Sequence, residues 1–209
     1  MTKASSNGSI LRKAFLVLAA AIGLGGCGGG GNPLDNPAQV GNSAGAAGQS
    51  LSFAYFQRCV NPIFDAAHTI VLNGVTASNT CSSSGCHASA TGRGGAFRVV
   101  AGAATWDLSN AANTPAIIRG SDIYKNFLSA QGEAIVGNYA QSLLVNKPLV
   151  RNGLHGGGQI FPDATDPNIK IIEYWISNPM PAGQDEFSTA GYNLFTPADP
   201  TNGACNTLP

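Results

Sequence analysis

The sequence predicts an all-α, loop-rich domain over residues 50–209, preceded by an export signal and a flexible tether. Two observations lead to this prediction. Apolar residues recur at three- and four-residue spacing in the segments 50–68 and 166–176, which is typical of amphipathic helices. Most of the chain between them is rich in glycine, proline and small polar residues, a composition that favours loops.

Residues 1–26 have the three parts of a bacterial secretory signal. Three basic residues lie in the first half, an apolar stretch covers residues 14–24, and Leu-Gly-Gly precedes Cys27. The apolar stretch is too short to span about 30 Å of hydrocarbon. The Leu-Gly-Gly-Cys ending resembles a lipobox, which implies a lipid on Cys27 and, because Gly28 rather than Asp follows, an anchor in the outer membrane. An ordinary signal peptide followed by an incidental cysteine is the alternative.

Residues 27–49 predict a flexible tether between lipid and domain, because Gly, Asn, Pro and Ala dominate them. The whole chain has eleven basic and eleven acidic residues. Removing the leader takes away three basic and no acidic residues, so eight face eleven and the net charge becomes −3. With that charge and no basic run, we expect no nucleic-acid partner.

The first predicted helix, over 50–68, starts from an N-cap at Ser50 or Ser52 and is kinked or interrupted at Pro62. Its apolar stripe consists of Phe53, Phe56, Val60, Ile63 and Phe64. Shorter helices are expected over 121–129 and 139–146. The segments left irregular or weakly extended are 94–100 and 105–115.

The last predicted helix covers 166–176, with Asp166 as its cap and Pro167 in its first turn. Two prolines, at positions 179 and 181, end it. Its apolar face consists of Ile169, Ile172, Trp175 and Ile176.

The most informative motif is Cys81, Cys86 and the adjacent His87, in a chain with five cysteines. The common covalent haem motif is Cys-x-x-Cys-His, in which both thiols bind haem vinyl groups and the histidine binds iron. Here four residues separate the cysteines, and Ser82–Gly85 are small and turn-forming, so the loop can bulge while Cys86 and His87 stay adjacent. This predicts one covalent haem c on Cys81 and Cys86, with His87 as the proximal iron ligand.

Three alternatives stay open for these cysteines. Cys81 and Cys86 could pair as a disulfide, act as a redox-active dithiol, or join Cys59 and His68 or His87 around zinc. If haem takes both and the lipid takes Cys27, Cys59 and Cys205 are the remaining pair and predict a disulfide that closes a loop of more than 100 residues.

The order of motifs resembles that of cytochromes c. A helix before the haem motif and an aromatic-bearing helix at the end are the arrangement of class I cytochromes c. Ser142–Leu149 (SLLVNKPL), then Leu154–Gly158 (LHGGG), then Tyr174–Ile176 (YWI) resemble a recurrent cytochrome c-like domain of environmental bacteria. That domain contains S-x-L-x-x-K-P-L, H-G-G and W-I in this order. The resemblance covers residues 50–178 and implies helices around one covalent haem.

Three side chains are candidates for the distal iron ligand. His155 is favoured, because the glycines around it let the backbone approach a flat macrocycle. Met180 is second, although it follows the last helix, whereas the distal methionine of His/Met cytochromes precedes it. His68 and an open sixth position share third place. Iron with two axial histidines has no position left for substrate, which predicts outer-sphere electron transfer and no enzymatic activity.

We therefore expect an exported, lipid-anchored, monohaem c-type cytochrome that exchanges single electrons with redox protein partners, with self-association as a further expectation. Trp175, Phe56 and Ile172 are expected at the haem pocket or in the core. The alternatives are a non-haem lipoprotein with Cys81–Cys86 and Cys59–Cys205 disulfides, and a haem enzyme with an open iron position.

Overall fold

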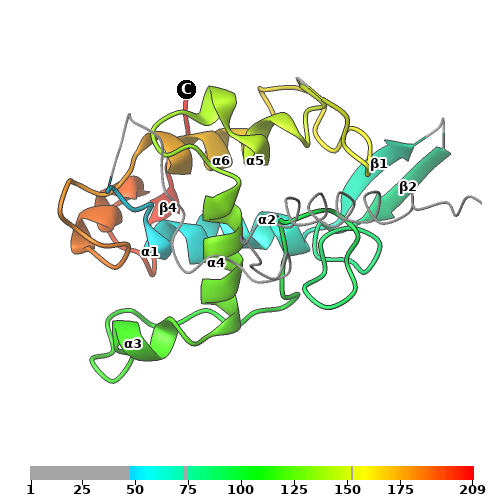
Figure 1. Cartoon of the computed structure of the whole chain (residues 1–209). Helices are drawn as coiled ribbons and strands as arrows, with labels where there is room; N and C mark the ends of the chain where they lie inside the picture. The colour runs from blue at the N-terminus through cyan, green and yellow to red at the C-terminus, as the bar shows by residue number, and fades with distance from the viewer. Residues whose placement is uncertain (1–47, 73–74, 152) are drawn as a thin grey trace, which may run out of the picture. The chain divides into compact units, whose positions relative to one another are not determined.

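A computed structural model describes residues 48–72, 75–151 and 153–209 (Figure 1). The predicted signal segment, Cys27 and the tether up to residue 47 lie outside the described residues. In the first part of the chain the elements are α1 (Phe53–Tyr55), η1 (Phe56–Val60), α2 (Asn61–Asp65), β1 (His68–Leu72), β2 (Val75–Asn79), α3 (Pro115–Ile118) and α4 (Asp122–Gly132). After these come η2 (Tyr139–Gln141), α5 (Leu143–Asn146), α6 (Pro167–Ser177), η3 (Thr189–Leu194), β3 (Phe195–Thr196) and β4 (Ala204–Cys205).

The prediction of an all-α, cytochrome c-like fold was wrong, because the described residues also form two antiparallel two-stranded sheets. β1 pairs with β2 from His68–Asn79 to Leu72–Val75, and β3 pairs with β4. The first helix accordingly ends at Asp65, and His68 belongs to a strand. The physical reason is local: β-branched residues flank the dipeptide Asn73-Gly74 in the sequence, a pattern that favours a hairpin over a helix.

The first helix runs through α1, η1 and α2, and Ser52 caps it as predicted. The Ser52 hydroxyl accepts a hydrogen bond from the Tyr55 N–H at 3.2 Å. η1 is a π-helical turn in which the Asn61 N–H donates to the Phe56 carbonyl, five residues back. Since proline has no N–H to continue the α-helical ladder, this wide turn lets the helix pass Pro62 instead of ending there. All five residues of the predicted stripe are buried.

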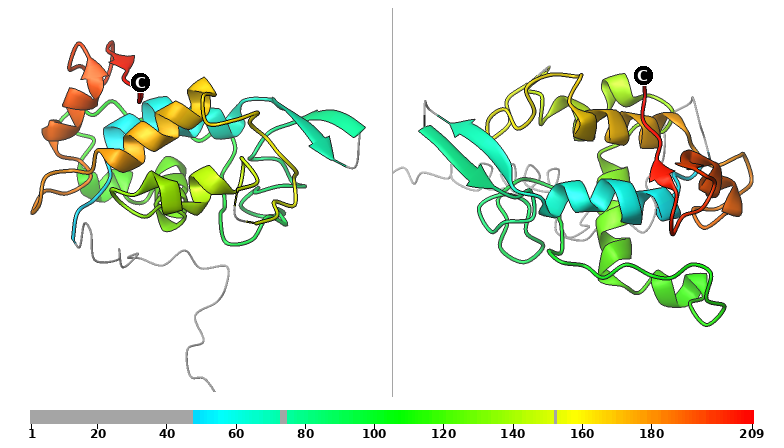
Figure 2. Two further views of the ribbon diagram at one scale, coloured as in Figure 1. Left: turned by 90° about the horizontal axis from the view of Figure 1, so that it is seen from above. Right: turned by 180° about the vertical axis from the view of Figure 1, so that it is seen from behind.

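α4 and α6 pack on this first helix, and the views from two sides show α4 crossing it and α6 running beside it (Figure 2). α6 starts as predicted, because the Asp166 carboxylate accepts the Asn168 N–H at 2.8 Å. α4 starts after its N-cap Ser121 but extends three residues beyond the predicted end. The predicted segment 139–146 forms two short helices, η2 and α5. The core between these elements is aromatic: the ring centroid of Phe56 lies 5.4 Å from those of both Phe127 and Trp175.

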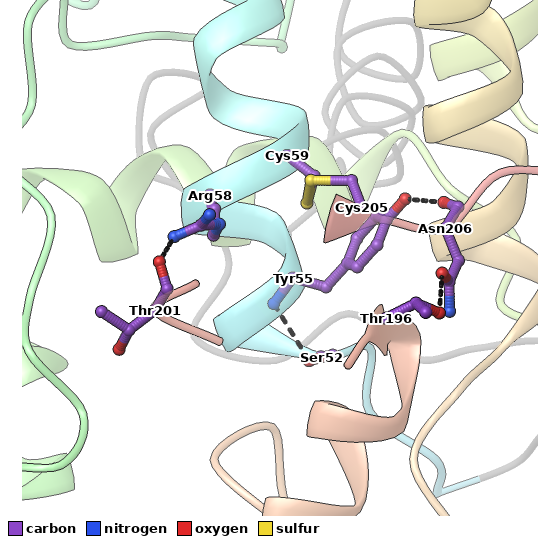
Figure 3. The surroundings of a disulfide bond; sticks show 8 residues. All are labelled: Ser52, Tyr55, Arg58, Cys59, Thr196, Thr201, Cys205 and Asn206. Carbon is purple, nitrogen blue, oxygen red and sulfur yellow. Dashed lines mark hydrogen bonds between the residues drawn. A yellow bond between two sulfur atoms is a disulfide. The ribbon is translucent and has the colours of Figure 1, made fainter. Parts of the chain in front are cut away.

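The segment after α6, residues 178–209, folds back onto the first helix. Cys59 and Cys205 form the predicted disulfide, with a sequence separation of 146 (Figure 3). The Tyr55 hydroxyl donates to the Asn206 carbonyl, and the Arg58 guanidinium donates to the Thr201 carbonyl. This segment lies outside the sequence resemblance, yet it is an integral part of the folded unit.

No helix within the described residues is long and apolar enough to span a membrane.

Candidate functional site

A cavity of about 690 Å³ brings the residues of the predicted haem motif together with His155, the predicted distal ligand. Its walls contain Cys81, Cys86 and His87 from the loop after β2, and His155 from the loop before α6. The volume lies in the range of roughly 300–1,000 Å³ that is typical of cofactor sites. The apolar part of the wall includes Ile63, Phe64, Phe97, Leu144, Ile160 and Ile172.

The loop between the two cysteines closes on itself through backbone hydrogen bonds. The Cys86 and Ala88 N–H groups both donate to the Ser83 carbonyl, at 3.0 and 3.1 Å, and the His87 N–H donates to the Cys81 carbonyl at 2.8 Å. The Ser82 N–H donates to Phe64 at the end of α2, at 3.1 Å. The four intervening residues thus form the expected bulge, while Cys81, Cys86 and His87 all line one cavity.

Cys81 and Cys86 are free thiols in this structure. Burial, reinforced by the neighbouring Cys86, raises the pKa of Cys81 to about 12. A redox-active dithiol requires a thiolate, and a raised pKa disfavours it. Cys59, one of the proposed zinc ligands, is bonded to Cys205 and is not free to bind zinc. In the part of the chain that the structure describes, no three His, Cys, Asp or Glu residues are grouped to hold a metal ion.

The His87 and His155 rings both line the cavity and lie in nearly parallel planes, with centroids 6.0 Å apart and planes inclined by 11°. Each ring places Nδ1 next to a backbone carbonyl: His87 next to Phe97 at 3.1 Å, and His155 next to Gly158 at 2.8 Å. Because a carbonyl oxygen only accepts hydrogen bonds, each Nδ1 carries a proton, and in the neutral form of either ring the lone pair is on Nε2. Metal-binding histidines are typically held this way, by a hydrogen bond from the other ring nitrogen.

Two histidine rings this close could together hold one metal ion or the iron of a haem, because the Nε2 of each ring is not bonded to these backbone carbonyls. Burial also lowers the pKa of His87, although its hydrogen bond to Phe97 opposes the shift. At neutral pH the imidazole is therefore uncharged, as a metal ligand must be.

Gly94 is a site residue that the sequence reasoning missed. A Cβ at this position would lie closer than 3.0 Å to Cε1 and Nδ1 of His87. The Gly94 N–H donates to the Cys86 carbonyl at 2.8 Å, which holds this backbone against the ring. The Gly94-Gly95 pair soon after the motif was the available signal, because glycine is common where backbone approaches another group closely.

Met180 and His68, the other two candidate ligands, are placed differently. Met180 is 2% exposed, belongs to the core and does not line the cavity, and its backbone N–H donates to Ser50 at 2.7 Å. His68 does line the cavity. Its Nε2 hydrogen-bonds to the Ile63 carbonyl at 2.7 Å, and its ring packs on Phe161 at 5.0 Å.

The predicted contact residues divide between cavity and core. Ile172 lines the cavity, whereas Phe56 and Trp175 are buried away from its wall. The Trp175 indole N–H instead donates to the Ser52 carbonyl at 3.0 Å.

Charged side chains also line the cavity, and none of them had been assigned from the sequence: Arg93, Glu133 and Lys147. Burial raises the pKa of Glu133, and the Lys147 ammonium opposes this shift. Lys147 also donates to the Leu154 carbonyl at 3.0 Å, one residue before His155. No protein-family model, curated protein or solved structure matches this chain.

Proposed function

We propose that this protein is a monohaem c-type electron carrier. Cys81 and Cys86 hold one covalent haem, His87 is its proximal ligand and His155 its distal ligand. The observation that supports this most strongly is the pair of nearly parallel imidazoles, 6.0 Å apart, in the same cavity as two free thiols.

The residues of the cavity have distinct roles in this proposal. The cysteines fix the group covalently, and the Phe97 and Gly158 carbonyls orient the two imidazoles so that each Nε2 can bind metal. The haem iron supplies reversible one-electron chemistry. If His87 and His155 both held the haem iron, a substrate would have no coordination position there, which supports an electron carrier rather than an enzyme.

The location and partners follow from the sequence. The leader and the lipobox-like ending support export and a lipid on Cys27 that anchors the domain in the outer membrane. Redox proteins of the cell envelope are the proposed partners, and a second copy of this chain is one of them. The low net charge supports transient docking to such partners.

An optical spectrum tests the proposal. The full precursor is expressed in a host that matures c-type cytochromes, and the purified protein is examined for a Soret band and a haem-c pyridine haemochrome. We expect one covalent haem with a low-spin spectrum, and loss of covalent attachment in the double variant Cys81→Ser/Cys86→Ser. Protein without covalent haem would refute the proposal, and a Cys81–Cys86 disulfide found by mass spectrometry would indicate the non-haem lipoprotein.

The distal ligand needs its own pair of variants. His155→Ala is expected to give a high-spin spectrum and rapid carbon monoxide binding after reduction. His68→Ala is the matched control, since it removes another imidazole that lines the same cavity. We expect this variant to keep the low-spin spectrum. A wild-type protein that is already high-spin would instead indicate an open iron position.

A further inference from the structure

We propose that Lys147 is a positioning residue for His155, so that the Lys-Pro pair at 147–148 holds the distal loop over the cavity. This inference rests on the proposed function, because it concerns the ligand that His155 provides. Lys147 follows the short helix α5, whose last turn it closes by donating its N–H to the Leu143 carbonyl at 2.9 Å.

The Lys-Pro pair contacts the distal loop on both sides of His155. On one side, the Lys147 ammonium donates to the Leu154 carbonyl at 3.0 Å. On the other side, the Pro148 carbonyl accepts the Ile160 N–H at 2.8 Å. His155 therefore lies between two points at which the loop is held to the end of α5.

Within the described residues, few other hydrogen bonds hold this stretch of the loop. Among the residues that the structure describes, Lys147 is the only one outside 151–162 that hydrogen-bonds to residues 153–158. The hydrogen bonds of His155 itself, from its ring to Gly158 and from the Gly158 N–H to its carbonyl, stay within the loop. They set the orientation of the ring within the loop, but they do not fix the loop to the rest of the molecule.

The chemistry of Lys147 suits this role. Its ammonium carries three donors and lines the cavity wall near Glu133, whose ionised form it favours. Leu154 is 88% exposed, so its side chain contributes almost no burial that could hold the loop in place. Among the described residues, the Lys147 hydrogen bond therefore holds the backbone just before His155.

The experiment uses the haem-loaded protein with Lys147→Ala, Lys147→Arg and the control Lys170→Ala. The control removes the same charge from α6, and within the described part of the chain Lys170 makes no hydrogen bond to the distal loop. The readout is the rate at which carbon monoxide binds the reduced protein, because the distal ligand must leave first. We expect Lys147→Ala to raise this rate about fivefold, the factor that corresponds to one net hydrogen bond of about 1 kcal/mol.

Lys147→Arg is expected to restore the wild-type rate, since arginine donates the same hydrogen bond but cannot be deprotonated to bind iron. Lys170→Ala is expected to match the wild type. If Lys147→Ala binds carbon monoxide no faster than Lys170→Ala, while His155→Ala does bind it faster, the positioning role is refuted and the His155 ligation stands. If His155→Ala changes nothing, the proposed ligation itself fails.

Discussion

An alanine at position 94 would bring its Cβ closer than 3.0 Å to the His87 ring, where ordinary contact begins at 3.4 Å. The ring cannot retreat freely, because its Nδ1–H is bonded to Phe97 and its plane packs against the Phe97 side chain at 4.8 Å. The alanine cannot retreat freely either, since the position 94 N–H is bonded to Cys86. We therefore expect Gly94→Ala to displace the His87 imidazole or the loop that carries it.

The size of the effect follows from this geometry. The overlap exceeds 0.4 Å against two ring atoms, and overpacking of this kind costs about 1–3 kcal/mol. The Gly94 φ angle is not in the left-handed region, so alanine adds no backbone strain and the cost is steric. For a chain of this length, each 1 kcal/mol lowers the midpoint of thermal unfolding by about 2–4 °C.

The assay compares thermal unfolding and the ferric spectrum of the haem-loaded protein with those of Gly85→Ala. Gly85 lies in the loop between the two cysteines, where an added Cβ would have no neighbouring atom within 4 Å, and it also avoids the left-handed region. We expect Gly94→Ala to lower the midpoint and perturb the spectrum, and Gly85→Ala to do neither. Equal midpoints and spectra for the two variants would show that Gly94 does not constrain His87.

Two further predictions concern stability. Cys59→Ala/Cys205→Ala is expected to lower the free energy of unfolding by about 5 kcal/mol, the chain-entropy value for a loop of 146 residues. The haem spectrum is expected to stay unchanged. A loss of stability below about 1 kcal/mol in urea titrations would contradict this prediction. Glu133 has a folded-state pKa above its ordinary 4.5 because of burial, so its ionisation destabilises the fold as pH rises above that value. Glu133→Gln is therefore expected to raise the urea midpoint at pH 7 and not at pH 4, and equal wild-type and variant midpoints at both pH values would contradict the assignment.

The helices could be predicted where their signals are local. Ser52, Ser121 and Asp166 each accept a hydrogen bond from an N–H two or three residues ahead, so the relevant pattern is contained in a few neighbouring residues. The hairpin was not predicted, although the dipeptide Asn73-Gly74 is visible in the sequence. The apolar stripe of the first helix led us to predict a helix that ended at His68, which is the first residue of a strand. The pairing of β3 with β4 had no comparable signal, since each strand has only two residues.

Side-chain chemistry and spacing singled out residues that the structure places at one cavity: Cys86 and His87 by their adjacency, and His155 by the glycines beside it. Their role in holding haem stays a prediction. What the sequence could not show is which backbone groups meet these side chains. The Phe97 and Gly158 carbonyls, and the backbone of Gly94 against the His87 ring, are tertiary contacts made by groups that every residue possesses.

The first helix separates the site from the segment that closes the fold. Near its start and middle, Tyr55 and Cys59 hold the C-terminal segment through a hydrogen bond and the disulfide, whereas at its end Ile63 and Phe64 line the cavity. Tyr55 and Phe64 are about nine positions apart, roughly 13 Å of helix. Met180 lies at the start of the first helix, on the side of the C-terminal segment. A Cβ added to Gly191 would contact both the Met180 sulfur and the Ser52 side chain. This separation explains why Met180, whose Met-Pro pair resembles a distal ligand in sequence, is a core residue in the fold. It also explains why cutting the disulfide is expected to change stability without changing the haem spectrum.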